Sequence, residues 1–185
     1  MDETIIRRSN LFQYLEYPNK YDPSRTWKYP QGVLGSCYCP NVTVFRESED
    51  TGYEYLEFPS TLSMICLPSI PWRGDKKNKL DTSFIDVFQR KMIQAMRVAI
   101  ENDHDAVVLS AFGCGYNKAP PTTIASLFYK IIASNFPNSF KHVVFGIIDN
   151  ETTFQKHNPK GNYNTFQDQF LKPKKNSKRK SIFNK

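Results

Sequence analysis

The chain has 185 residues, of which 39% are hydrophobic and 14% aromatic, a composition typical of one globular domain rather than a disordered chain. It has no run of about eighteen apolar residues, which argues against a membrane-spanning helix, and no apolar secretory signal at its start. The four cysteines form no CxxC pair and have no histidine at metal-ligand spacing. We therefore expect reduced thiols in an intracellular protein, cytoplasmic or nuclear, without a metal ion or cofactor.

The net charge of +7 is concentrated at the C-terminal end. Residues 172–185 hold 7 of the 25 lysines and arginines and no acidic residue, so the other 18 basic residues balance the 18 acidic ones. A neutral body argues against a general nucleic-acid-binding surface on the folded domain. The lysine-rich segment fits a nuclear-localisation signal or a nucleic-acid anchor, and equally a solubilising disordered end.

The first half of the chain is expected to begin with an amphipathic helix over residues 2–17, because apolar residues recur there at helical spacing. Residues 18–40, rich in Pro, Tyr, Gly and Asn, predict a long loop. The β-branched residues of 41–46 predict a strand, with 53–58 as its hairpin partner. The apolar run 62–67 has the length of a buried strand.

The second half alternates helices with buried strands. Residues 82–101 predict a long helix, followed by a buried strand over 106–109. A helix is expected from about 120 to 134, because proline is tolerated in a first helical turn. Residues 143–148 predict a third buried strand, and a short helix is expected at 150–156.

This order predicts an α/β fold with βαβ units on a mostly parallel sheet. Apolar strands without alternation are typical of sheets covered by helices on both faces. We expect one domain over residues 1–157 and a polar, lysine-rich, disordered tail over 158–185. Because ligands bind beyond the carboxyl ends of such strands, the turn at residues 112–117 is expected at the mouth of a site.

Two glycines in that turn flank a cysteine, in the run Gly113-Cys114-Gly115. Glycines let a backbone approach a ligand closely, and the helix that follows presents free N–H groups and the positive end of its dipole. The turn therefore predicts a cradle for a diphosphate, and a plain tight turn is the alternative. No histidine is placed to activate Cys114, so we interpret it as a small packing residue rather than a nucleophile.

Several separated blocks resemble one known family. The run 110–115, followed by Pro120-Pro121 and a helix, is similar to the phosphate loop of the microbial-type poly(ADP-ribose) glycohydrolases. The run 145–149 resembles the strand that follows that loop in the family. The N-terminal helix and the next strand also match the family's spacing, through Met1-Asp2-Glu3, Arg7, Ser9, Leu11, Tyr38, Pro40, Val42 and the run 44–46.

This resemblance implies a three-layer α/β/α macrodomain-like fold that binds ADP-ribose or ADP-ribosylated proteins. Residues Gly113, Cys114, Gly115, Tyr116 and Asn117 would wrap the diphosphate, and Tyr116 is the candidate for stacking. Asp2 would contact the ligand. Glu3 would be the catalytic acid that protonates the ribose–ribose glycosidic oxygen, since an alkoxide is a poor leaving group.

The chain also departs from the family pattern. The family's glycine-rich diphosphate loop precedes its Gln-Glu-Glu motif, whereas this chain begins at that motif, with Met1 and Asp2 in place of Gln and the first Glu. We therefore expect the N-terminal strands to be missing or reduced. Three hypotheses follow: a glycosidase acting on ADP-ribose polymers, an inactive ADP-ribose-binding module, and an interaction protein that acts through the basic segment 172–185.

Overall fold

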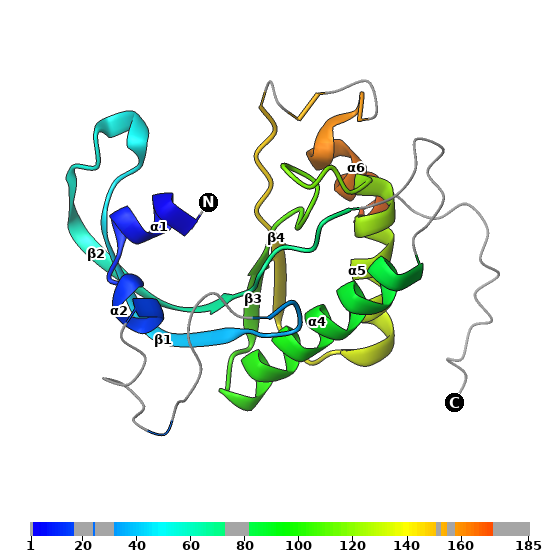
Figure 1. The fold of residues 1–185 in the computed structure, drawn as a ribbon, viewed down its shortest axis with the longest axis horizontal. Coiled ribbons are helices and arrows are strands. Elements are labelled where there is room, and N and C mark those ends of the chain that lie inside the picture. The colour runs from blue at the N-terminus through cyan, green and yellow to red at the C-terminus, as the bar shows by residue number, and fades with distance from the viewer. Residues whose placement is uncertain are drawn as a thin grey trace, which may run out of the picture. The chain divides into compact units, whose positions relative to one another are not determined.

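The computed structural model describes residues 2–16, 24, 32–72, 82–150, 153–154 and 158–171, and the chain divides into two compact units (Figure 1). The first unit comprises Met1–Ile70 and Thr82–His104, and the second comprises Pro71–Asp81 and Asp105–Lys185. The described strands form two two-stranded sheets, one antiparallel and one parallel, in place of the expected single, mostly parallel sheet.

The first unit begins with two short helices, α1 (Asp2–Arg8) and α2 (Phe12–Glu16), where one helix was expected over 2–17. The interruption lies at Ser9, whose hydroxyl donates to a carbonyl one turn earlier over 2.7 Å. The same hydroxyl oxygen accepts the backbone N–H of Leu11 over 3.2 Å. A serine that binds the backbone on both sides competes with helical hydrogen bonds and redirects the chain.

A long ribbon of two strands follows, β1 (Cys37–Arg46) and β2 (Tyr55–Cys66). The two strands pair antiparallel, and the turn between them contains the short helix η1 (Glu49–Thr51). β2 is continuous across the two strands expected at 53–58 and 62–67. The expectation that 62–67 is a buried strand was wrong, because Leu62 is 45% exposed and its neighbours are only partly covered in this ribbon.

Helix α4 (Thr82–Glu101) has the bounds that its periodicity predicted. Its buried face carries apolar side chains at helical spacing, namely Phe84, Phe88, Met92, Ala95, Met96 and Ala99. Just beyond its C-terminal end, the His104 Nε2 atom lies 2.8 Å from the Tyr38 hydroxyl of β1. This hydrogen bond connects the end of the helix to the ribbon within the first unit.

Lys91 interrupts the apolar face of α4 with a buried amine. Its side chain is 1% exposed, and its Nζ atom has no hydrogen-bond partner in the described part of the chain. Burial lowers the pKa of Lys91 from 10.5 to about 8. Between these two pH values the unfolded chain binds more protons than the folded one, so the free energy of unfolding rises with pH there.

Replacing Lys91 with methionine is expected to raise the free energy of unfolding at neutral pH by about 1–3 kcal/mol. The substitution removes a buried charge without a described partner, and the methionine side chain has a volume similar to that of lysine. The stability gain with pH between about 8 and 10.5 should disappear in the variant. Urea denaturation at neutral and alkaline pH measures both effects, with the exposed Lys130→Met as control. A less stable Lys91→Met protein at neutral pH would contradict this account.

The second unit contains the βαβ segment that the sequence predicted, in the order β3 (Ala106–Leu109), α5 (Pro121–Asn135) and β4 (His142–Phe145). The two strands pair in parallel, from Ala106 opposite His142 to Leu109 opposite Phe145. On one face, Phe145 contacts aromatic rings of the helices. The alternate side chains Val108 and Val144 are 76% and 51% exposed, so the expectation of strands covered on both faces was wrong for this pair.

Helix α6 (Gly161–Phe170) lies where the sequence analysis expected a disordered tail over 158–185. Two aromatic residues four positions apart explain the difference, because Phe166 and Phe170 bring their rings within 5.2 and 4.7 Å of the Phe145 ring. Because most residues of this segment are polar, its composition alone does not indicate that Phe166 and Phe170 form an apolar stripe. Residues 172–185 lie outside the described part of the chain, as does most of the short helix expected at 150–156.

Asp149, which follows β4, caps the start of α6. Its Oδ1 atom accepts the backbone N–H of Asn162 over 2.9 Å, and its Oδ2 atom accepts that of Tyr163 over 3.0 Å. A carboxylate in this position satisfies N–H groups that a helix start leaves open, and it faces the positive end of the dipole.

Asp149→Ala is therefore expected to lower the free energy of unfolding by about 1–2 kcal/mol. Asp105→Ala provides a matched control, since its ion pair with Lys141 is exposed and screened by solvent and therefore contributes little to stability. Urea denaturation of both variants measures the difference. Equal losses in the two variants would mean that the Asp149 cap adds nothing beyond a surface carboxylate.

Candidate functional site

The loop over residues 110–120 leaves the carboxyl end of β3 and leads into α5. Gly113 has a φ of 82°, in the left-handed region that favours glycine. Its carbonyl accepts the backbone N–H of Ala119 over 3.0 Å, and the carbonyl of Gly115 accepts that of Lys118 over 2.9 Å. The loop is therefore closed by its own backbone and returns the chain to the first turn of the helix.

Three consecutive residues of this loop have backbone N–H groups without a partner in the described part of the chain. Among the described residues, the N–H groups of Gly115, Tyr116 and Asn117 have no hydrogen-bond acceptor. A Cβ atom built on Gly115 would meet nothing within 4 Å, so the space beside the loop is open at this residue. α5, which follows, has no acidic residue in its first turn. Such an arrangement is suited to an anion, because unpaired N–H groups and a helix start both favour negative charge.

The side chains of the loop differ widely in exposure. Cys114 is 6% exposed, and burial raises the pKa of its thiol to about 12, so the thiol is neutral at physiological pH. This agrees with a packing role rather than a nucleophilic one. The Tyr116 ring is 98% exposed, and Asn117 is partly buried.

Lys118 is a loop residue that the sequence analysis did not single out. It is exposed, and its φ of 54° lies in the left-handed region. It is also the sole charged residue between 110 and 120 in the sequence, a signal that could have identified it. An ammonium group beside unpaired N–H donors adds to the positive potential of the loop.

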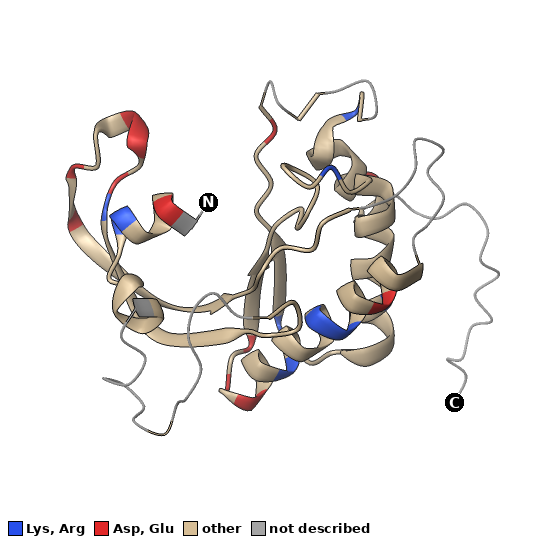
Figure 2. Cartoon of the chain, in the orientation of Figure 1, with Lys and Arg blue, Asp and Glu red and all other residues tan. Residues whose placement is uncertain are grey.

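The two acidic candidates, Asp2 and Glu3, lie in α1 of the first unit, whereas the five loop candidates lie together in the second unit. The Glu3 side chain is 78% exposed, and its Oε1 atom is 2.7 Å from the Nη2 atom of Arg7. α1 carries the acidic Glu3 in its first turn and the basic Arg7 and Arg8 in its last turn (Figure 2). The hydrogen bond from Arg7 to Glu3 raises the pKa of the guanidinium. Glu3 is thus an exposed side chain paired with an arginine of its own helix.

No group of three or more His, Cys, Asp or Glu residues within the described ranges is placed to hold a metal ion. No described helix combines the length and the apolar character needed to cross a membrane.

Comparison with known proteins gives matches by structure alone. No family model matches the chain, and no curated protein does. Poly(ADP-ribose) glycohydrolase from Deinococcus radiodurans in complex with ADP-ribose is 20% identical, with a TM-score of 0.70 over 91% of this chain and 66% of that chain. The enzyme from Thermomonospora curvata is 21% identical, with a TM-score of 0.67 over 91% of this chain and 60% of that chain. The chain therefore has the mixed α/β fold of these proteins and spans just under two thirds of their length.

Proposed function

Because the chain has the fold of bacterial poly(ADP-ribose) glycohydrolases, we propose that it binds ADP-ribose and that residues 113–117 receive the diphosphate. The observation that carries this proposal is the set of three consecutive backbone N–H groups, at Gly115, Tyr116 and Asn117, without an acceptor among the described residues. The similar protein from Deinococcus radiodurans was crystallised in complex with ADP-ribose, which supports the choice of ligand.

The chemistry of the loop matches the parts of that ligand. Phosphate oxygens accept hydrogen bonds, which the free N–H groups can donate, and Lys118 adds a positive charge. The exposed ring of Tyr116 offers a face for stacking on the adenine or against a ribose. Stacking of this kind contributes about 1–3 kcal/mol per base.

Calorimetric titration of the 185-residue chain with ADP-ribose tests the proposal, with AMP as the control ligand. We expect micromolar affinity for ADP-ribose and clearly weaker binding of AMP, since AMP lacks the diphosphate. Equal affinity for ADP-ribose and AMP would mean that the loop does not recognise the diphosphate. Absence of binding would overturn the proposal.

We further propose that the function is binding rather than hydrolysis of the glycosidic bond. The catalytic role of Glu3 stays a prediction from resemblance, and its side chain is 78% exposed and paired with Arg7 of the same helix rather than enclosed. A glycosidase acid must be held in place against the scissile bond. The contact of the Glu3 side chain in the described part of the chain is instead a surface ion pair with Arg7.

The variant Glu3→Gln distinguishes the two functions. We expect its affinity for ADP-ribose to remain within about twofold of the original, because the proposed donors are backbone N–H groups of residues 115–117 and glutamine keeps the shape of Glu3. We also expect neither protein to release ADP-ribose from poly(ADP-ribose), measured by chromatography of the products. Release by the original chain that is lost in Glu3→Gln would establish hydrolysis and would assign Glu3 as its acid.

A further inference from the structure

Three of the four cysteines gather on one face of the ribbon in the first unit. Cys37 and Cys39 lie two residues apart in β1, so both project from the same face, and Cys66 of β2 lies directly opposite Cys37. The Sγ atoms of Cys37 and Cys39 are 3.4 Å apart, and the Cys39 thiol also forms a hydrogen bond with Cys66. None of the three is part of a disulfide in the structure.

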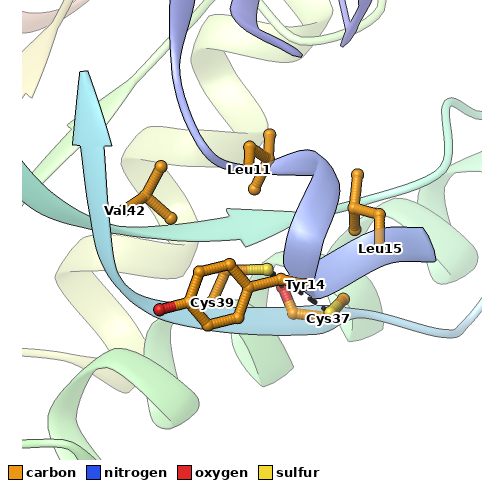
Figure 3. Close-up of a cluster of buried hydrophobic side chains, with 6 residues drawn as sticks. All are labelled: Leu11, Tyr14, Leu15, Cys37, Cys39 and Val42. Atoms are coloured by element: carbon orange, nitrogen blue, oxygen red, sulfur yellow. Dashed lines mark hydrogen bonds between the residues drawn. The ribbon is translucent and has the colours of Figure 1, made fainter. Parts of the chain in front are cut away.

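The sulfur atoms lie beneath the N-terminal helices. Figure 3 shows Tyr14 of α2 beside Cys37 and Cys39 in the buried cluster that also contains Leu11, Leu15 and Val42. Cys37 and Cys39 are 2% and 0% exposed, whereas Cys66 is only partly buried. Cys66 is therefore the thiol of this group that a small reagent in solution reaches first.

The backbone geometry selects one pair for a covalent bond. Residues directly opposite in an antiparallel pair have Cα atoms about 4.5–5.5 Å apart, inside the range of about 4.4–6.8 Å that disulfides require. Two residues spaced i and i+2 on one strand are separated by about 6.6 Å at Cα, and their Cβ atoms point the same way. The Cβ atoms of a disulfide must approach to about 3.5–4.5 Å, so Cys37 and Cys39 cannot close one without bending β1.

We propose that Cys37 and Cys66 form an oxidative modification site, at which a hydroperoxide converts the thiols of these paired residues into a cross-strand disulfide. In the first step the sulfur of Cys66 attacks the peroxide, giving a sulfenic acid and, from hydrogen peroxide, water. In the second step the sulfur of Cys37 displaces the hydroxyl of the sulfenic acid, which leaves as a second water, and the S–S bond forms. The two sulfur atoms are oxidised by two electrons in total, and the peroxide is reduced.

This disulfide would join the start of β1 to the end of β2, beneath helix α2. It would fix one end of a ribbon that is otherwise held by hydrogen bonds and by the packing of α1 and α2. The proposal is independent of the proposed ligand, because it rests on residues of the first unit alone.

Treatment of the folded full chain with hydrogen peroxide tests the proposal, followed by thiol counting and by mass spectrometry of peptides digested without reduction. We expect the loss of two of the four thiols and one linked peptide pair that contains Cys37 and Cys66. Cys114, in the second unit, should remain reduced, because its thiol is buried and has a pKa of about 12. Addition of a dithiol reductant should restore all four thiols.

Single variants assign the pair. Cys66→Ser and Cys37→Ser should each prevent the linked peptide, whereas Cys39→Ser and the matched control Cys114→Ser should retain it. Four intact thiols in the treated original chain would overturn the proposal, since that result does not depend on the folding of any variant. A mapped disulfide between Cys37 and Cys39, or between Cys39 and Cys66, would overturn it equally.

Discussion

Replacing Gly115 with valine is expected to weaken the affinity for ADP-ribose at least about tenfold while changing the free energy of unfolding by less than about 0.5 kcal/mol. The fold should tolerate the change, because Gly115 does not have a positive φ and a Cβ atom there meets nothing within 4 Å. The branched side chain would instead occupy the open space beside the unpaired N–H groups. Phosphate oxygens could then no longer approach these donors to hydrogen-bond distance.

Calorimetry with ADP-ribose measures the affinity, and urea denaturation measures the stability of the same preparation. Gly32→Val is the matched control, because Gly32 also has open space around its Cβ position, has no positive φ and belongs to the first unit. It should leave both quantities unchanged. If Gly115→Val binds ADP-ribose as tightly as the original chain, the diphosphate is not held by this loop.

Replacing Phe128 with alanine is expected to lower the free energy of unfolding by about 3–5 kcal/mol. The side chain is 1% exposed, and its ring meets those of Phe145 in β4 and Phe166 in α6, at centroid distances of 5.4 and 6.3 Å. The substitution would leave a cavity where a helix, a strand and a second helix of the same unit converge. Because small proteins are stable by only about 5–15 kcal/mol, this loss is a large fraction of the total.

Urea denaturation followed by circular dichroism measures this loss. The neighbouring Tyr129→Ala is a suitable control, since Tyr129 is 37% exposed and contacts the ring of Phe170 at the rim of the same region. We expect a clearly smaller destabilisation from the control. Similar losses in both variants would show that the centre of this aromatic cluster is no more important for stability than its rim.

Elements with strong local signals were predicted well from the sequence. The helix over 82–101 and the strand over 106–109 have their expected bounds, because a long apolar stripe and a short β-branched run are each read from neighbouring residues. The interruption of the first helix at Ser9 and the merging of two expected strands into β2 were missed. The local hydrogen bonds of Ser9 are accompanied by a bridge to the distant Val44, and the continuity of β2 depends on its pairing with β1.

For the candidate site as well, the features set by neighbouring residues were predicted, and those set by the three-dimensional structure were not. The turn at 113–117 was predicted because glycines that follow a strand permit a tight turn, a signal that neighbouring residues carry. In the structure, backbone hydrogen bonds close this loop. The unpaired state of its N–H groups follows from three-dimensional geometry, which composition does not reveal. The ion pair of Glu3 with Arg7 was readable in principle, since residues four apart on a helix lie side by side. The family resemblance implied a role for Glu3 and implied nothing about its pairing with Arg7.

The two sheets also differ in the chain entropy that their pairing costs. In the ribbon, Arg46 and Tyr55 face each other across a short turn, so joining the strands closes only a small loop. In the parallel pair, Leu109 and Phe145 meet across the whole of the 110–120 loop and α5. The closure penalty is therefore larger for the sheet that carries the 110–120 loop, and prior formation of α5 reduces this penalty by shortening the flexible part of the connection. The stability of helix α5 thus contributes to the pairing of β3 with β4, although the helix is not part of their sheet.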